Sequence, residues 1–258
     1  MIYVGTSGFS YDDWVGPFYP QALPKRDMLR AYAERFSCVE LNFTHYRMPE
    51  ARTLAQMADK TAPDFRFVVK ANQDMTHQRT GEPAVFEQFA AALEPLIERG
   101  QFGCVLAQFP YSFHATRESV AYLRLFREAM GELPTAIEFR NARWVMPGTF
   151  KFLREQRLGF CCVDEPALQG LMPRVAEATS DVAYVRFHGR NAAKWWEHEE
   201  AWQRYDYLYS EEELAEWVGD VRRLDGEARE TYVFFNNHYQ AQAVKNAEMF
   251  QKLLGLDG

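Results

Sequence analysis

The chain has 258 residues, 47% of them hydrophobic, and its 29 Lys and Arg against 36 Asp and Glu give a net charge of −7. This length and apolar content fit one α/β domain with a large core, and the acidic balance excludes general binding to nucleic acid or anionic membranes. The start, MIYVGTSGF, has no signal-peptide pattern, and no apolar run approaches the ~20 residues of a membrane span. Its four cysteines form no CxxC pair, so we expect buried free thiols and a cytoplasmic protein.

Short apolar runs recur along the chain, and nearly every one ends in a polar or ionisable residue. They occupy residues 2–7, 38–43, 65–70, 104–109, 135–140, 160–165, 183–188 and 232–237. Between most of them, apolar residues at i, i+3, i+4 and i+7 predict helices. These helices fall within 29–36, 86–97, 120–130, 210–221 and 243–254, with two more starting near Pro49 and Pro147. Residues 166–182 predict at most a short helix.

This order predicts an α/β fold, a single (β/α)₈ TIM-type barrel over residues 1–258, with a long aromatic-rich loop after the seventh strand. The main rival is an open doubly wound sheet, whose strands are apolar on both faces. Here Val39 and Leu41 alternate with Glu40 and Asn42, so one face of the strand is polar. A barrel interior that opens into a polar mouth explains this alternation, and the chain has no GxGxxG fingerprint.

The polar side of the strands defines a charged mouth at their C-terminal ends, where barrel enzymes carry their chemistry. Strand parity places these side chains inward: Glu40, Asn42, Lys70, Asn72, Gln108, Glu138, Arg140, Asp164, Arg186, His188, Asn236 and His238. An ion network that only seals the interior is one explanation. A functional site is the other, because burying so many charges is costly even when they are paired.

We predict an enzyme that uses acid/base chemistry on a small anionic substrate, phosphorylated or polyhydroxylated. The candidate acid/base groups are Glu40, Glu138, Asp164 and His188. The candidate substrate-binding residues are Ser7, Asn42, Lys70, Asn72, Gln108, Arg140, Arg186, Arg190, Trp195, Trp196, Asn236 and His238. Within that set Lys70, Arg140 and Arg186 are the expected clamps for a phosphate or carboxylate. Hydrolase, lyase and isomerase chemistry are not separated by these residues.

The segment between His188 and Ser210 is rich in aromatic residues and includes Trp195, Trp196 and Trp202. Loops this long at a barrel mouth often act as lids or binding loops, and their rings stack on sugars or bases. The alternative is that the rings pack the loop against the barrel rim. Both interpretations can hold for different rings.

Other function classes stay open. No cofactor is predicted, but a metal-dependent hydrolase or isomerase is a less favoured alternative, with ligands from Glu40, Glu138, Asp164, His188 and His238. Against a metal, no local ligand spacing such as HExxH occurs, and three cations adjoin these groups. A second alternative is a non-catalytic module that binds a nucleotide or single-stranded nucleic acid, and a third is a scaffold whose aromatic loop docks a protein. The sequence carries no signal for the oligomeric state.

Blocks of sequence along the whole chain resemble the YecE-like family, domain of unknown function 72. The blocks are VGTSGFSYDDWVGPFYP, VELNFTHYRMP, FVVKAN, LAQFP, IEFRNARW, VDEP, YVRFHGRN, YLYSEEEL and FFNNHYQAQAVKNA. The resemblance implies a single TIM-type barrel and supplies no catalytic roles. One departure is Asn141, where a histidine is common, which argues against a mechanism that requires a histidine at this position.

Overall fold

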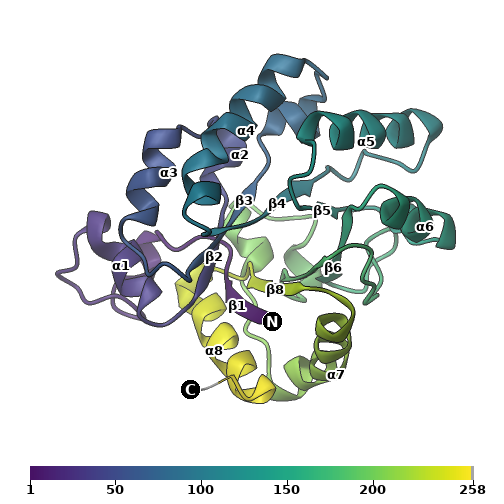
Figure 1. The fold of residues 1–258 in the computed structure, drawn as a ribbon. Coiled ribbons are helices and arrows are strands. Elements are labelled where there is room, and N and C mark those ends of the chain that lie inside the picture. The colour runs from purple at the N-terminus through teal and green to yellow at the C-terminus, as the bar shows by residue number, and fades with distance from the viewer. Residues whose placement is uncertain (257–258) are drawn as a thin grey trace.

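Eight parallel strands form the centre of the molecule in a computed structural model that describes residues 1–256 (Figure 1). Their order in the sheet is β1-β8-β7-β6-β5-β4-β3-β2. The strands are β1 (Ile2–Thr6), β2 (Cys38–Leu41), β3 (Arg66–Lys70), β4 (Phe102–Gln108), β5 (Thr135–Glu138), β6 (Gly159–Asp164), β7 (Val182–Phe187) and β8 (Glu230–Phe235). Each overlaps one of the eight predicted runs, so the strand prediction is confirmed.

The sheet curls into a near-closed barrel. Seven neighbouring strand pairs form ladders, whereas β1 and β2, the first and last strands of that order, are joined by a single backbone bridge near their C-terminal ends. There Ser7 and Glu40 form an isolated parallel bridge, and the N–H of Gly8 donates to the carbonyl of Glu40 at 2.8 Å. The backbone of Glu40 therefore completes the ring at the end of the barrel where the polar side chains gather.

Helices surround the strands (Figure 1). The α-helices are α1 (Met28–Ala33), α2 (Phe43–Tyr46), α3 (Ala51–Ala58), α4 (Pro83–Glu98), α5 (Arg117–Met130), α6 (Pro147–Glu155), α7 (Glu211–Glu227) and α8 (Gln242–Leu254). A capping box begins α7: Ser210 and Glu213 exchange hydrogen bonds with each other's backbone N–H. No α-helix lies between β6 and β7, as the weak pattern of 166–182 predicted. Within residues 1–256, no helix combines the length and apolarity needed to cross a membrane.

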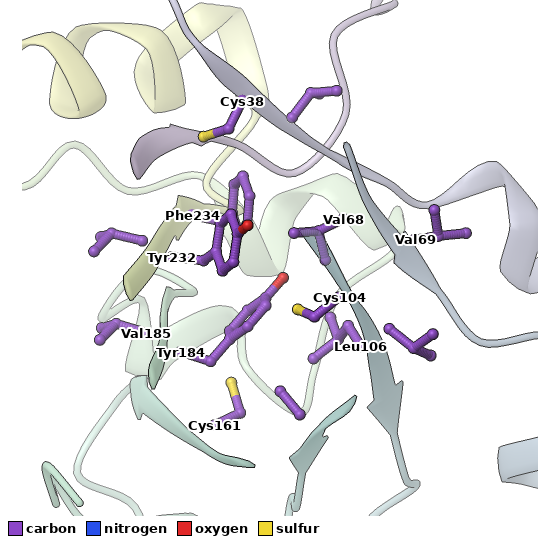
Figure 2. Close-up of a cluster of buried hydrophobic side chains, with 14 of the residues drawn as sticks. Cys38, Val68, Val69, Cys104, Leu106, Cys161, Tyr184, Val185, Tyr232 and Phe234 are labelled. Atoms are coloured by element: carbon purple, nitrogen blue, oxygen red, sulfur yellow. The ribbon is translucent and has the colours of Figure 1, made fainter. Parts of the chain in front are cut away.

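Below the C-terminal mouth, the barrel interior is filled with apolar and aromatic side chains. Tyr184, Tyr232 and Cys104 point toward one another between the strands (Figure 2). Gly103 makes room for this packing, because a Cβ at that position would lie 2.6 Å from the Tyr232 hydroxyl. All four cysteines are buried free thiols, as predicted. Because these side chains fill the middle of the barrel, the polar side chains of the predicted mouth lie at its C-terminal end.

One predicted parity is wrong. Asp164 at the end of β6 faces helix α7, where its carboxylate accepts hydrogen bonds from Arg190 at 2.7 and 2.9 Å, Tyr209 at 2.7 Å and Trp217 at 2.8 Å. Glu165, the next residue, points inward in its place and lies 3.4 Å from Arg140. The reason is that F-C-C-V-D-E is apolar on both parities and ends in two acids, so alternation does not fix which acid faces the barrel. Arg190, predicted to bind substrate, is bonded to Asp164.

We expect Asp164→Ala to lower the free energy of unfolding by roughly 3–5 kcal/mol, because it removes a buried carboxylate that pairs with Arg190 and satisfies the Trp217 indole and Tyr209 hydroxyl. Urea unfolding followed by far-ultraviolet circular dichroism measures this. The control is Asp220→Ala, which removes a partly exposed pair with Arg174 and should change the free energy by less than about 1 kcal/mol. Equal losses in the two variants would show that the Asp164 contacts do not stabilise the fold.

Candidate functional site

The guanidinium of Arg186 lies at the centre of the site. From β7 it reaches across the barrel, with Nη1 2.6 Å from the Glu138 carboxylate on β5 and Nη2 2.6 Å from the Glu40 carboxylate on β2. Nη2 also donates to the Ser7 hydroxyl at 3.3 Å. Arg186 is 1% exposed, and both carboxylates are fully buried. One cation therefore joins three strands and the segment after β1.

A second layer of contacts orders Glu138. Its Oε1 forms an ion pair with Arg140 Nε at 2.8 Å and lies 3.0 Å from His188 Nε2. The other ring nitrogen of His188 is 3.1 Å from the Asn236 amide nitrogen. With the Asn236 amide donating to Nδ1, the neutral ring of His188 donates from Nε2 to Glu138. Both ring nitrogens of His188 then have a partner. Burial and the nearby Arg140 lower the pKa of His188 to about 3, in agreement with a neutral ring.

Glu40 and Glu138 are both held by several donors. Glu40 accepts from the Tyr184 hydroxyl at 2.7 Å and from the Asn42 amide at 2.9 Å, in addition to Arg186. Burial alone raises the pKa of Glu138, but Arg140, Arg186 and His188 outweigh it and hold this pKa well below its ordinary range. Burial likewise opposes the charge on Arg186, and its two carboxylates outweigh burial and raise its pKa. Arg186 and Glu138 are a fixed ion pair at neutral pH.

Lys70, at the end of β3, is a cation of the mouth that has no partner in this network. Its ammonium makes no hydrogen bond or ion pair with any group in residues 1–256, and the side chain is partly exposed. Glu40 and Glu138 are each held by Arg186, and Arg140 pairs with Glu138 and Glu165, so none of these carboxylates is paired with Lys70. Burial, followed by repulsion from Arg186, lowers the pKa of Lys70 to about 8.

Two histidines lie beside Lys70, His45 in α2 after β2 and His77 in the helical turn Asp74–Gln78 after β3. The rings of His45 and His77 pack edge to face, with their centroids 4.6 Å apart. Burial and the charge of Lys70 lower the pKa of each to about 4. Both rings are therefore neutral near pH 7 and add no charge to this side of the mouth.

Glu165 is a site residue that the sequence reasoning missed. It is 8% exposed, its Oε1 accepts the backbone N–H of Met172 at 2.8 Å, and its Oε2 lies 3.4 Å from Arg140. Burial raises its pKa to about 7, and the attraction of Arg140 only partly opposes that shift. The motif V-D-E-P shows two acids at a strand end, but only the position of β6 shows that the second one faces the barrel.

Several other predicted residues lie at the mouth without joining the network. Asn72 donates to the carbonyl of Thr44 at 3.0 Å, and Gln108 donates to the carbonyl of Phe109 at 2.8 Å, so both amides support loop backbone. The ring of His238 stacks on Tyr11 with centroids 4.7 Å apart. These residues shape the wall of the mouth, whereas the partly exposed side chains of Asn42, Lys70, Arg140 and Asn236 face its opening.

The long loop after β7 packs over the mouth, and its three tryptophans differ in their surroundings. Trp195 is 2% exposed and has the Arg204 guanidinium over its ring. Trp202 stacks on Tyr239 after β8 with centroids 4.2 Å apart. Trp196 is 52% exposed and touches Tyr111 after β4 edge to face at 5.5 Å. Trp195 and Trp202 therefore pack the loop, and Trp196 is the ring that solvent and ligands can reach.

A hollow of about 940 Å³ lies at the opposite end of the barrel and is lined by Arg66, Gly103 and Glu230 among others. A second one, about 520 Å³, lies at the mouth between Tyr111, His114 and Arg143. We place the candidate site at the mouth despite this difference in size, because the buried, mutually bonded ionisable groups converge there. Nowhere in residues 1–256 do three His, Cys, Asp or Glu side chains gather so as to hold a metal ion.

The fold and the site define a class: a near-closed eight-stranded parallel α/β barrel with a buried ionic network and one unpaired lysine at the carboxyl ends of its strands. The chain belongs to the DUF72 family, described as a protein of unknown function, whose model matches residues 3–258. The family resemblance seen in the sequence is thereby confirmed.

One relative matches the whole length of this chain and another matches about half of it. It is 33% identical to the UPF0759 protein YunF of Bacillus subtilis (strain 168), over 100% of this chain and 96% of that protein. It is 30% identical to the UPF0759 protein YecE of Escherichia coli (strain K12) over 57% of this chain and 52% of that protein. The crystal structure of a DUF72 family protein from Thermotoga maritima MSB8 matches with a TM-score of 0.92 and 46% identity, over 99% of both chains.

Glu165 should give the protein a pH-dependent stability. Because its pKa is raised from 4.5 to about 7 in the folded state, the folded protein holds this proton more tightly than the unfolded chain. The resulting stabilisation is present below about pH 4.5 and is lost as the pH rises to 7, by roughly 3 kcal/mol at most. We expect the difference in unfolding free energy between wild type and Glu165→Gln to change by that order between pH 4.5 and 7.5.

Urea titrations across this pH range measure the effect. Glu155→Gln is the control, because Glu155 is an exposed carboxylate that pairs only with Lys151 at 3.9 Å. Its difference from wild type should stay constant with pH. If the Glu165→Gln curve also runs parallel to wild type, the carboxyl of Glu165 titrates normally and is not a proton carrier near pH 7.

Proposed function

We propose that this protein is an enzyme that binds a small anionic molecule, phosphorylated or polyhydroxylated, at the C-terminal mouth of a single TIM-type barrel domain. The observation that carries the proposal is the unpaired charge of Lys70. This ammonium is partly exposed and has no anionic partner in the described chain. A buried unpaired charge is costly, and an anionic ligand would offset that cost.

Arg140 is the second group suited to the anion. Its side chain is 13% exposed and uses Nε for Glu138, so the rest of the guanidinium fork faces Glu165 and the opening. Arg186 is different, because both of its terminal nitrogens are bonded to buried carboxylates. We therefore assign the anion to Lys70 and Arg140 and give Arg186 a positioning role.

Glu165 is the group best suited to move a proton. A pKa of about 7 lets a carboxyl both donate and accept a proton near neutral pH, which favours general acid/base catalysis. Glu138 is held ionised by its cations, and both nitrogens of His188 are engaged. We infer that Glu138 and His188 hold the network in place and that Glu165 takes the acid/base role.

Exposed aromatic rings around the mouth support a ligand that carries hydroxyls or a ring. Among the described residues, the most exposed aromatic side chains are Phe43, Tyr46, Tyr111 and Trp196. All four lie in the segments that follow the carboxyl ends of β2, β4 and β7. Such rings stack on sugar rings or bases. A nucleotide is the second candidate, with its base in the 520 Å³ hollow beside Tyr111 and its phosphate at Lys70.

The test is a thermal-shift screen of phosphorylated sugars and hydroxy acids against their uncharged counterparts. A ligand present at about 100 times its Kd should stabilise the protein by roughly 2.7 kcal/mol, and the uncharged counterpart should give no shift. Lys70→Met should weaken binding at least tenfold, whereas Lys70→Arg, which keeps the charge, should weaken it less. Adding AMP beside ribose 5-phosphate shows whether a base contributes.

Lys194→Met is the matched control, because Lys194 is an exposed lysine in the loop after β7. This variant should bind like wild type. We also expect Lys70→Met to be at least as stable as wild type at pH 7, since it removes an unpaired, desolvated charge. If no anionic compound in the screen stabilises the protein, the proposed function is contradicted. It is also contradicted if wild type and Lys70→Met respond alike.

A further inference from the structure

We propose that Lys70 is a nucleophile that forms an imine with the aldehyde or ketone group of the substrate, so that the ligand of this site is a small anionic carbonyl compound. This inference rests on the proposed function, because it uses the same mouth and the same lysine. In the proposed function Lys70 only binds the anionic group of the ligand, whereas here its amine also forms a covalent bond with the ligand.

The first support is the position of the amine. Lys70 ends β3 at the mouth, its side chain is partly exposed, and no carboxylate of the described chain is within ion-pair distance of its nitrogen. The charged and titratable groups that face it are Glu40 from β2, Glu138 and Arg140 from β5 and its end, Arg186 from β7, His45 from α2 and His77 from the segment after β3. An amine without an internal partner is free to attack a bound carbonyl carbon.

The second support is the distribution of charge around the amine. The carboxylates Glu40 and Glu138, which favour an ammonium at Lys70, are themselves bonded to Arg186. Burial lowers the pKa of Lys70 first, and Arg186 lowers it further, to about 8. At pH 7 roughly one amine in ten is then neutral, against about one in three thousand for an amine with its ordinary pKa. Desolvation beside another cation is a known way to activate a lysine for imine formation.

The step balances with groups of the site. The lone pair of the neutral Lys70 nitrogen forms the C–N bond, and the carbonyl π pair moves to oxygen. That oxygen takes one proton from the nitrogen and one from Glu165, which holds a proton near pH 7, and leaves as water. The nitrogen keeps one hydrogen and becomes an iminium, while Glu165 becomes a carboxylate. No electrons are gained or lost, so no oxidant or reductant is needed.

Imine formation is compatible with anion binding. The iminium carries the same single positive charge as the ammonium it replaces, so the phosphate or carboxylate of the substrate keeps its counterion. Arg140 provides a second cation that cannot lose its proton. The same site can therefore hold the anion and react with the carbonyl of one molecule.

Reductive trapping tests the inference. Wild-type protein is incubated at pH 7 with glyoxylate or dihydroxyacetone phosphate and sodium cyanoborohydride, and modified lysines are located by peptide mass spectrometry. We expect Lys70 to be modified at least tenfold faster than any other lysine, and uncharged dihydroxyacetone to react at least tenfold more slowly there. The rate at Lys70 should rise with a midpoint near pH 8, whereas exposed lysines rise only at higher pH.

Two variants separate the inference from the proposed function. Lys70→Arg keeps the charge and cannot form an imine, so it should still show a thermal shift with anions, smaller than that of wild type, and lose the trapped adduct. Lys194→Met should retain both. Anion-dependent stabilisation with modification spread over the surface lysines and the N-terminus overturns the imine and leaves the anion site intact. If there is no anion-dependent stabilisation, the proposed function itself fails.

Discussion

The arrangement of the mouth depends on one buried guanidinium. Arg186 pairs with Glu40 and Glu138 at 2.6 Å each, and none of the three has more than 1% exposure. Removing such charges from water costs several kcal/mol per ion, which is offset only by close contacts on every side. Ser7, Tyr184, Asn42, Arg140 and His188 supply those contacts. These groups come from different strands, so one arginine links several strands at the mouth, although its buried Nε has no hydrogen-bond partner among the described residues.

The alternation of polar and apolar residues was enough to predict the fold and most of the network. It worked at β5 and β7, where Glu138 and Arg186 stand between apolar neighbours that face the helices. It failed at β6, because Cys161, Cys162 and Val163 are apolar on both parities and the strand ends in two acids. A shift of one residue exchanges the two faces of a strand, so Asp164 became a link to α7 and Glu165 entered the site.

The roles of the aromatic rings could not be read from sequence for a different reason. Trp195, Trp196 and Trp202 lie within eight residues and have no periodic pattern, and each finds its partner on another part of the chain. Trp202 is packed by Tyr239 after β8, and Trp196 meets Tyr111 after β4. Burial of these rings is decided by tertiary contacts between loops that are distant in sequence, which residue type and spacing do not encode.

The residue type at position 70 matters because the surrounding charges are fixed. An arginine there would stay protonated at any physiological pH and would only add a third guanidinium. A lysine can lose its proton, and burial together with the charges of Arg186 and Arg140 favours that loss. Burial therefore has opposite effects on two groups of the mouth. It lowers the pKa of Lys70 to about 8 and raises that of Glu165 to about 7, so that near neutral pH one can be a free amine while the other still holds a proton.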